Sequence, residues 1–332
     1  METNRESPAP ARSVRALLNR PQISLVTATI LWGGNFVAGK ALAGDAPIVA
    51  ISFWRWALAL IVLLPFSFGA LRQHRATLLA HWRLIATIGA TGIAGYTLCV
   101  YTALAATTAI NALLFISTAP LLITLANWFV YRDRVAPWQV AGTVVSSLGA
   151  VVVIAHGDAA RLAALRFNRG DLWILAGVFV WVAYSLLLRR RPATVPPLHF
   201  FTATVLAGSV LLAPLYAWTF AHGERLVPTI PNMLGVLYVA LGASALGYAC
   251  WTRGVAALGP DRAGTFLHLI PVFGTAMAIA FLGERLAPYH LAGAALVAGG
   301  LALASLRSTP RLPITAPHPR QPRPGPAAGQ AK

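Results

Sequence analysis

Apolar runs of about 20 residues alternate with short polar stretches along most of the chain. The hydrocarbon core of a bilayer is about 30 Å thick and takes about 20 helical residues to cross, whereas a soluble domain has no need of such runs. The pattern therefore predicts an all-α polytopic membrane protein with about ten transmembrane helices. Their predicted positions are about 23–43, 47–68, 83–104, 107–130, 136–156, 171–189, 198–220, 231–256, 262–282 and 288–306.

The two ends of the chain do not follow this pattern. Residues 1–22 are polar, with several Arg and Pro residues, and 307–332 is rich in proline. Neither segment has the apolar content to form a core, so both are predicted to be disordered. The first apolar run also resembles a secretory signal peptide, with a small-residue cleavage site at 41–43. Asn35 and Lys40 inside that run, and its counterpart later in the chain, favour a retained helix.

Composition and charge support a membrane protein and indicate its orientation. Apolar residues make up 57% of the chain and charged residues 11%, and the mean hydropathy is +0.67. The net charge of +17 would suggest nucleic acid in a soluble protein, but the basic residues here stand mostly between apolar runs. With the N-terminus inside, eighteen Lys and Arg residues fall in inside segments and five in outside loops. Because cytoplasmic loops are enriched in these residues, we predict a multi-pass protein of the inner (plasma) membrane with both termini cytoplasmic.

The second half of the chain repeats features of the first about 150 residues later, which is the mark of an internal repeat. Each half carries five predicted spans, and because five is odd, the second half would enter the membrane in the opposite sense. We therefore predict two inverted five-helix repeats, 23–156 and 171–306, joined by an extracytoplasmic loop at 157–170, with a site between them near the membrane midplane. The matching pairs include Trp32 with Trp181, Gly95-Tyr96 with Gly247-Tyr248, Pro120 with Pro271 and Pro137 with Pro288.

Several short segments carry a family resemblance: LWGGNFVAGKAL at 31–42, FWRW at 53–56, the two Gly-Tyr pairs, and PVF…LGERL at 271–286. Together they resemble the drug/metabolite transporter (DMT) superfamily, and within it the EamA-type family, over about 23–306. The resemblance implies two inverted five-helix repeats, cytoplasmic ends and a central substrate cavity, and many members of that family export amino acids or other small metabolites. The chain departs from the pattern at 132–133, where Arg-Asp stands in place of the Gly-Glu at 283–284.

Aromatic and amide residues at helical spacing are the first candidates for a binding site. Trp32 and Asn35 lie one turn apart on the first predicted helix, and Trp181 and Tyr184 repeat the spacing on the sixth. One interpretation is a cavity wall that stacks on a solute and hydrogen-bonds it; the other is helix packing, with Asn35 as an interhelical contact. The resemblance places four more aromatic residues along the cavity, again with packing as the alternative: Tyr96, Tyr101, Tyr248 and Trp251.

Two prolines and one histidine interrupt otherwise apolar helices. A proline removes one amide donor and frees a carbonyl four residues earlier, so Pro120 and Pro271 are predicted hinges or kinks, with direct solute binding as the alternative. His268 lies inside a predicted span, and histidine is the side chain that titrates near neutral pH without a large shift. It is therefore a candidate site residue and proton relay; a neutral histidine bonded to a carbonyl is the alternative.

Arg55 lies about eight residues inside its predicted span, too deep to reach the interface easily. We therefore expect it to point inward and pair with carbonyls or with a solute carboxylate. No Asp or Glu lies deep in any predicted span, so the familiar acidic carrier of protons or sodium is missing from the sequence. A cavity with a cationic Arg55 and no buried acid suits carboxylate-bearing or zwitterionic solutes better than lipophilic cations.

These features favour a secondary transporter that exports small polar metabolites, with amino acids as the leading class, by alternating access through the central cavity. The alternatives are an exporter of multiple drugs or cationic compounds and a metabolite importer of the same fold. We do not expect an enzyme, because the predicted spans hold no Asp/His cluster, Ser/His pair, metal-ligand set or phosphate loop. No cofactor, metal or nucleic acid is expected; the predicted partners are a small-molecule substrate and membrane lipid, and the protein would be a monomer or a homodimer.

Overall fold

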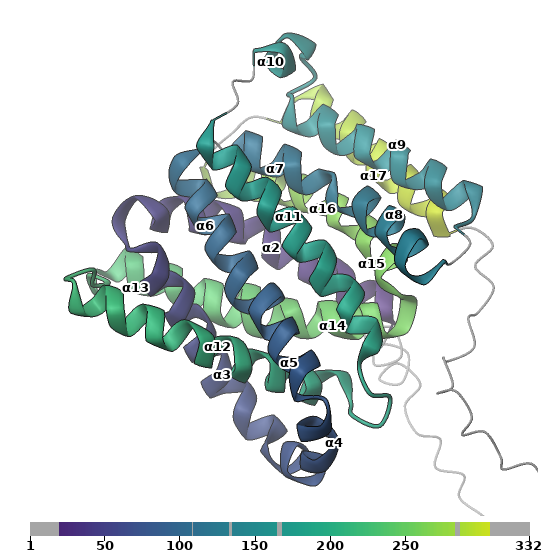
Figure 1. Ribbon diagram of the computed structural model, residues 1–332. Coiled ribbons are helices and arrows are strands. Elements are labelled where there is room, and N and C mark those ends of the chain that lie inside the picture. Colours follow the sequence, from purple (N-terminus) through teal and green to yellow (C-terminus); the bar gives the residue numbers. More distant parts are fainter. Residues whose placement is uncertain (1–19, 108, 133–134, 165–167, 283–285, 306–332) are drawn as a thin grey trace, which may run out of the picture.

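The computed structural model describes residues 20–107, 109–132, 135–164, 168–282 and 286–305. This part of the chain is helical, without strands (Figure 1). The predicted disordered ends fall almost wholly outside the described residues. So do most of the turns at 132–134 and 283–285, which carry the departure from the family pattern.

The first half of the described chain consists of helices that run in the same order as those of the second half. In the first half they are α2 (Pro21–Asp45), α3 (Ile48–Gln73), α4 (Arg75–Ala80), α5 (Trp82–Ile88), the π-helical segment η1 (Gly89–Gly95), α6 (Tyr96–Ala106), α7 (Ala109–Ser117), α8 (Ala119–Tyr131) and α9 (Pro137–Ile154). After the short helix α10 (Ala159–Ala163), the second half has α11 (Arg169–Leu187), the 3-10 turn η2 (Leu188–Arg190), α12 (Pro197–Ala221), α13 (Ile230–Tyr238), the π-helical segment η3 (Val239–Leu246), α14 (Gly247–Leu258), α15 (Pro260–Thr265), the 3-10 turn η4 (Phe266–His268), α16 (Leu269–Leu282) and α17 (Pro288–Ser305).

Six stretches of the described chain are long and apolar enough to cross a membrane: 48–73, 82–106, 137–154, 169–190, 197–221 and 230–258. Each coincides with a span predicted from the hydropathy pattern. Two shorter apolar helices, at 115–131 and 288–304, lie at the positions of the predicted fourth and tenth spans. The other predicted spans, 23–43 and 262–282, correspond to α2 and to the broken helix α15–η4–α16. The count of about ten spans therefore stays a prediction.

Both halves contain a π-helical segment at the same place. Segment η1 runs directly into Tyr96, and η3 is followed at once by Gly247 and Tyr248. A π-helical turn holds one residue more than an α-helical turn, and such turns are frequent at functional sites. The fourth predicted span of the first half is broken between α7 and α8, and its counterpart in the second half is broken at η4.

The two prolines predicted as hinges lie in the first turn of a helix. Pro120 is the second residue of α8 and Pro271 the third of α16. A proline is tolerated there because the first amides of a helix have no intrahelical acceptor. Before Pro120 the chain forms a tight turn, in which the Thr118 amide donates to the Phe115 carbonyl at 3.0 Å. Both prolines thus stand at real breaks, and their role as hinges stays a prediction.

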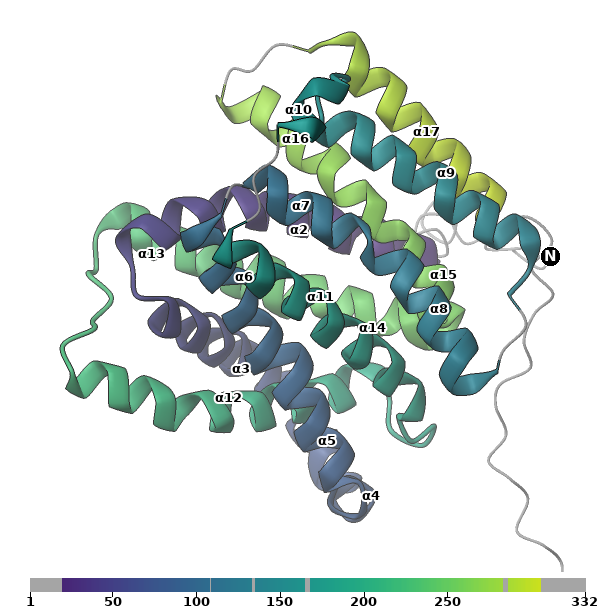
Figure 2. The same ribbon diagram turned by 45° about the horizontal axis from the view of Figure 1, so that its top comes forward.

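Helices α9 and α17 lie side by side at one edge of the molecule in both views (Figures 1 and 2). Their backbones approach closely at glycines: a Cβ atom added to Gly149 would lie 2.7 Å from the Gly293 carbonyl oxygen. Gly142 and Gly300 meet in the same way, at 2.5 Å. These four glycines therefore serve close contact between the two halves of one chain.

Candidate central cavity

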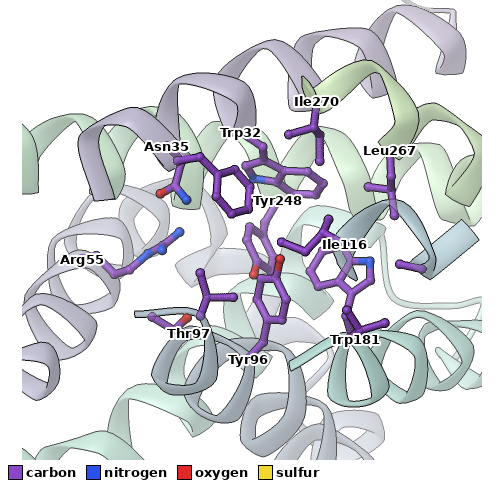
Figure 3. A pocket seen from close by; sticks show the side chains of 14 residues that line it. Trp32, Asn35, Arg55, Tyr96, Thr97, Ile116, Trp181, Tyr248, Leu267 and Ile270 are labelled. Atoms are coloured by element: carbon purple, nitrogen blue, oxygen red, sulfur yellow. The ribbon is translucent and has the colours of Figure 1, made fainter. Parts of the chain in front are cut away.

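A narrow cavity lies where α2, α3 and α6 of the first half meet α11, α14 and α16 of the second (Figure 3). The space open to the centre of a water molecule is about 20 Å³, which is room for roughly one water. The cavity is therefore nearly filled by its own side chains. They are Trp32, Asn35, Phe36, Arg55, Tyr96, Thr97, Val100, Ile116, Ala119, Val178, Trp181, Tyr248, Leu267 and Ile270.

Four aromatic rings from both halves form one wall of this cavity. The Trp32 ring centroid lies 5.3 Å from that of Trp181 and 5.3 Å from that of Tyr248, and both pairs are edge-to-face. Tyr96 stands 4.8 Å from Trp181 by the same measure. Such pairs contribute about 0.5–1.5 kcal/mol each beyond their buried area. Trp32 and Trp181, matched in the sequence by the repeat, thus meet face to edge across the boundary between the halves.

Trp251 and Tyr184 form a second layer behind this wall. The Trp251 centroid is 5.5 Å from Trp32 and 5.4 Å from Trp181, and Tyr184 lies 5.1 Å from Trp181. Neither lines the cavity, and both are fully buried. Within the described residues, the indole N–H groups of Trp181 and Trp251 and the Tyr184 hydroxyl have no hydrogen-bond partner. Buried donors of this kind are costly, so the cluster carries unused hydrogen-bonding capacity next to the cavity.

Arg55 forms the polar end of the cavity and is only 4% exposed. Its Nε donates to the Ser244 hydroxyl at 2.7 Å, and its Nη1 donates to the Tyr101 hydroxyl at 3.0 Å. Tyr101 in turn donates to Asn35 Oδ1 at 3.5 Å. Arg55 points inward as predicted, but its hydrogen-bond partners among the described residues are hydroxyls instead of carbonyls, and its guanidinium carbon also lies 5.2 Å from the centroid of the Trp56 ring. Sequence reasoning missed Ser244, because serine is common in apolar helices and nothing in its spacing set it apart.

Two aromatic side chains donate hydrogen bonds across the boundary between the halves to backbone carbonyls of the π-helical segments. The Trp32 indole Nε1 donates to the Ala243 carbonyl of η3 at 2.9 Å. The Tyr248 hydroxyl donates to the Gly92 carbonyl of η1 at 3.2 Å. Each half therefore places an aromatic donor on the π segment of the other half. This reciprocity joins the aromatic wall directly to the backbone of both repeats.

His268 lies apart from the other candidates. It is 0% exposed and does not line the cavity, although its neighbour Leu267 does. Its Nε2 lies 3.1 Å from the Ser147 hydroxyl oxygen and 3.1 Å from the Ser117 carbonyl. Because the Ser147 hydroxyl donates to the Thr143 carbonyl, His268 Nε2–H is the donor in both contacts. This arrangement favours the alternative of a neutral histidine bonded to a carbonyl.

The structure thus brings nine of the ten candidate residues into one cluster around the cavity and sets His268 apart. Within the described ranges, no group of three or more His, Cys, Asp or Glu side chains could hold a metal ion. Cys99 and Cys250 are free thiols.

Comparison with known proteins identifies the family of this chain. The model of the EamA-like transporter family matches residues 20–155 and again 168–306. The chain is 27% identical over 288 residues to the transporter YyaM of Bacillus subtilis, covering 85% of this chain and 92% of that protein. It is 28% identical to a protein of Streptantibioticus cattleyicolor named as a terminal-alkyne amino-acid exporter, covering 89% of this chain and 96% of the relative.

A Salmonella typhimurium protein named as an amino-acid metabolite efflux pump is 30% identical over 52% of this chain and 59% of its own length. A solved crystal structure has the same fold, with a TM-score of 0.68 at 23% identity, and covers 86% of this chain and 96% of its own. The family match spans both halves of the chain in turn, which agrees with the repeated order of helices. The chain belongs to the EamA-like transporter family.

Proposed function

We propose that this chain is a secondary transporter that exports small polar metabolites, with amino acids as the leading class, across the inner membrane. The observation that carries the proposal is the central cavity, because residues from both halves line it and the cross-repeat hydrogen bonds of Trp32 and Tyr248 bridge it. Transporters built from inverted repeats bind their solute at such a boundary. The names of two relatives support export of amino acids or their metabolites.

Alternating access follows from the same arrangement. The halves, 23–156 and 171–306, rock about the cavity, and both termini stay in the cytoplasm. Because the described cavity has space for about one water molecule, it corresponds to a closed state, and a solute enters only when the aromatic wall parts. The breaks at Pro120 and Pro271 are one matched pair of places at which the helix direction can change during this motion.

One observation favours a second candidate, an exporter of cationic compounds. The faces of Trp32, Trp181 and Tyr248 attract cations, and such aromatic clusters bind quaternary amines in other proteins. The two candidates differ in their solutes, so one experiment separates them. The purified protein in proteoliposomes should exchange a labelled amino acid in counterflow, whereas exchange of quaternary amines alone would support the second candidate.

A pair of double variants tests whether the cavity is the transport site. Trp32→Ala with Trp181→Ala opens the aromatic wall and lowers stability, because both indoles are buried, and it should abolish saturable counterflow in the protein that still folds. The matched control, Trp82→Ala with Trp128→Ala, removes two indoles that are 59% and 55% exposed on the outer surface and should transport normally. Normal counterflow by the folded cavity variant, or equal loss of transport in both double variants, would contradict the proposal.

A further inference from the structure

The Arg55 guanidinium carries a charge that no acid among the described residues neutralises. The acids in the described part with defined side-chain positions are Asp158, Asp171, Glu224 and Asp261, and none of them contacts Arg55 or lines the cavity. Burying a charge without an opposite charge is costly, and natural proteins keep such a charge chiefly for function.

Part of the guanidinium remains available for a ligand. Of its five N–H donors, Ser244 takes the one on Nε and Tyr101 takes one on Nη1. The remaining three have no protein partner among the described residues, and Figure 3 shows the group extending into the cavity beside Asn35. Ser244 and Tyr101 also hold the plane of the guanidinium in place. A fixed, planar fork with free N–H groups matches the two oxygens of a carboxylate.

The opposite end of the cavity is apolar and aromatic. Trp181, Ile116, Leu267 and Ile270 line it, and Figure 3 shows them on the side away from Arg55. No acid of the described part stands there to pair with an ammonium group. The cavity therefore offers Arg55 as an anchor for a carboxylate and an apolar surface for the rest of the solute. No acidic side chain among its described lining residues requires the solute to carry an ammonium group.

We propose that the cavity selects solutes with one carboxylate and an apolar body, the carboxylate binding in bidentate fashion to Arg55 and the body lying among the rings of the aromatic wall. This inference rests on the proposed transport function and names the solute class for the same site. It makes the α-amino group of an amino acid dispensable, so the deaminated 2-oxo acid should be accepted as well as the amino acid. The carboxamide of the same amino acid, which lacks the anion, should be rejected.

The test uses two matched sets of three probes in proteoliposomes: leucine, leucinamide and 4-methyl-2-oxopentanoate, and phenylalanine, phenylalaninamide and phenylpyruvate. We expect both acids of at least one set to exchange and its amide to be weaker by roughly 10- to 100-fold, the range for loss of a charge-assisted hydrogen-bonded pair. Equal exchange of acid and amide, or exchange of an amide with neither acid of its set, would overturn the inference and leave the transporter in place. No exchange of any probe by folded protein would contradict the transport function itself.

Variants of Arg55 separate binding from structure. Arg55→Gln should lose exchange of the acids, yet the empty protein should unfold at the same temperature as wild type or higher, because a buried charge without an acid partner is removed. A lower unfolding temperature together with an unchanged preference for acid over amide would indicate a structural arginine. The control Arg253→Gln makes the same change at an exposed position of α14 and should leave the preference unaltered.

Arg55→Lys keeps the inference testable if the Gln variant does not fold. Lysine retains the charge but not the fork, so we expect the preference for acid over amide to persist with affinity for the acids weakened roughly tenfold. Loss of the preference in a folded Arg55→Lys protein would overturn the assignment of the carboxylate to this residue.

Discussion

Trp32→Phe is expected to weaken the contact between the two halves by removing one hydrogen bond. The substitution keeps an aromatic ring at the centre of the cluster but deletes the Nε1 donor, which lies 2.9 Å from the Ala243 carbonyl. Trp251→Phe is a matched control in the same cluster, since its indole N–H has no partner among the described residues. Both changes remove the same atoms, and only the first breaks a hydrogen bond.

The size of the effect follows from this comparison. Loss of the smaller ring of a buried indole costs packing energy in both variants, and that cost largely cancels in the difference between them. The remaining difference is the cost of leaving the buried Ala243 carbonyl without its side-chain donor, which is about 1–3 kcal/mol. Taking about 1.5 kcal/mol, Trp32→Phe should raise the unfolding equilibrium constant roughly tenfold more than Trp251→Phe does.

Thermal unfolding in detergent, followed with a thiol-reactive fluorophore, would measure this difference. Cys99 is buried and Cys250 partly buried, so both become reactive when the helices separate. We expect a lower unfolding temperature for Trp32→Phe than for Trp251→Phe. Equal temperatures, or the reverse order, would refute the reasoning that Trp32 links the first half to η3. If Trp32→Phe lowered the affinity for the solute and left the unfolding temperature unchanged, we would infer that the indole N–H of Trp32 contacts the solute.

Three further predictions concern single positions. Gly92→Ala should lower the free energy of unfolding by about 3 kcal/mol, because the new Cβ would overlap the fully buried Tyr184 ring; unchanged thermal stability would argue against the packing of η1 described above. Asp171→Ala should cost at least about 1 kcal/mol in the same assay, because it removes the acceptor of the capping-box bond from the Asn168 amide and of the bond from the Thr107 hydroxyl, and an effect near zero would contradict that role. His268→Gln should leave the ratio of counterflow at about pH 6 to that at about pH 8 as in wild type, because His268 is enclosed outside the cavity; a changed ratio would restore it as a proton relay.

The hydropathy pattern was sufficient to locate the helices but not their internal breaks. The predicted span 198–220 corresponds to α12 at 197–221, because a long apolar run has few other solutions in a membrane. By contrast, nothing in the sequence indicated the π-helical segments η1 and η3. An extra residue in one helical turn leaves the hydropathy pattern unchanged. The free-energy cost of the wider turn is offset by contacts with other helices, such as the hydrogen bond from Trp32 to the Ala243 carbonyl.

The candidate site was predictable where the repeat supplied independent information. Trp32 and Trp181 were matched by the repeat and lie together, and the Gly-Tyr pairs led to Tyr96 and Tyr248 at the cavity. His268 had no such support. It ends η4 directly before α16, whose residues are apolar almost throughout, so periodicity could not indicate which face meets the cavity.

The π-helical segments also determine which face of the following helix meets the cavity. If η1 relaxed to a regular α-helix without losing a residue, everything after it would rotate by about 100° relative to the helix before it, because each α-helical residue turns the chain by about that angle. Tyr96 would then leave the cavity and Tyr101 would leave Arg55, although every functional side chain is still present. The same holds in η3 for Tyr248 and Trp251. At these two places a substitution that favours a regular α-helical turn would therefore displace the residues that line the cavity without replacing any of them.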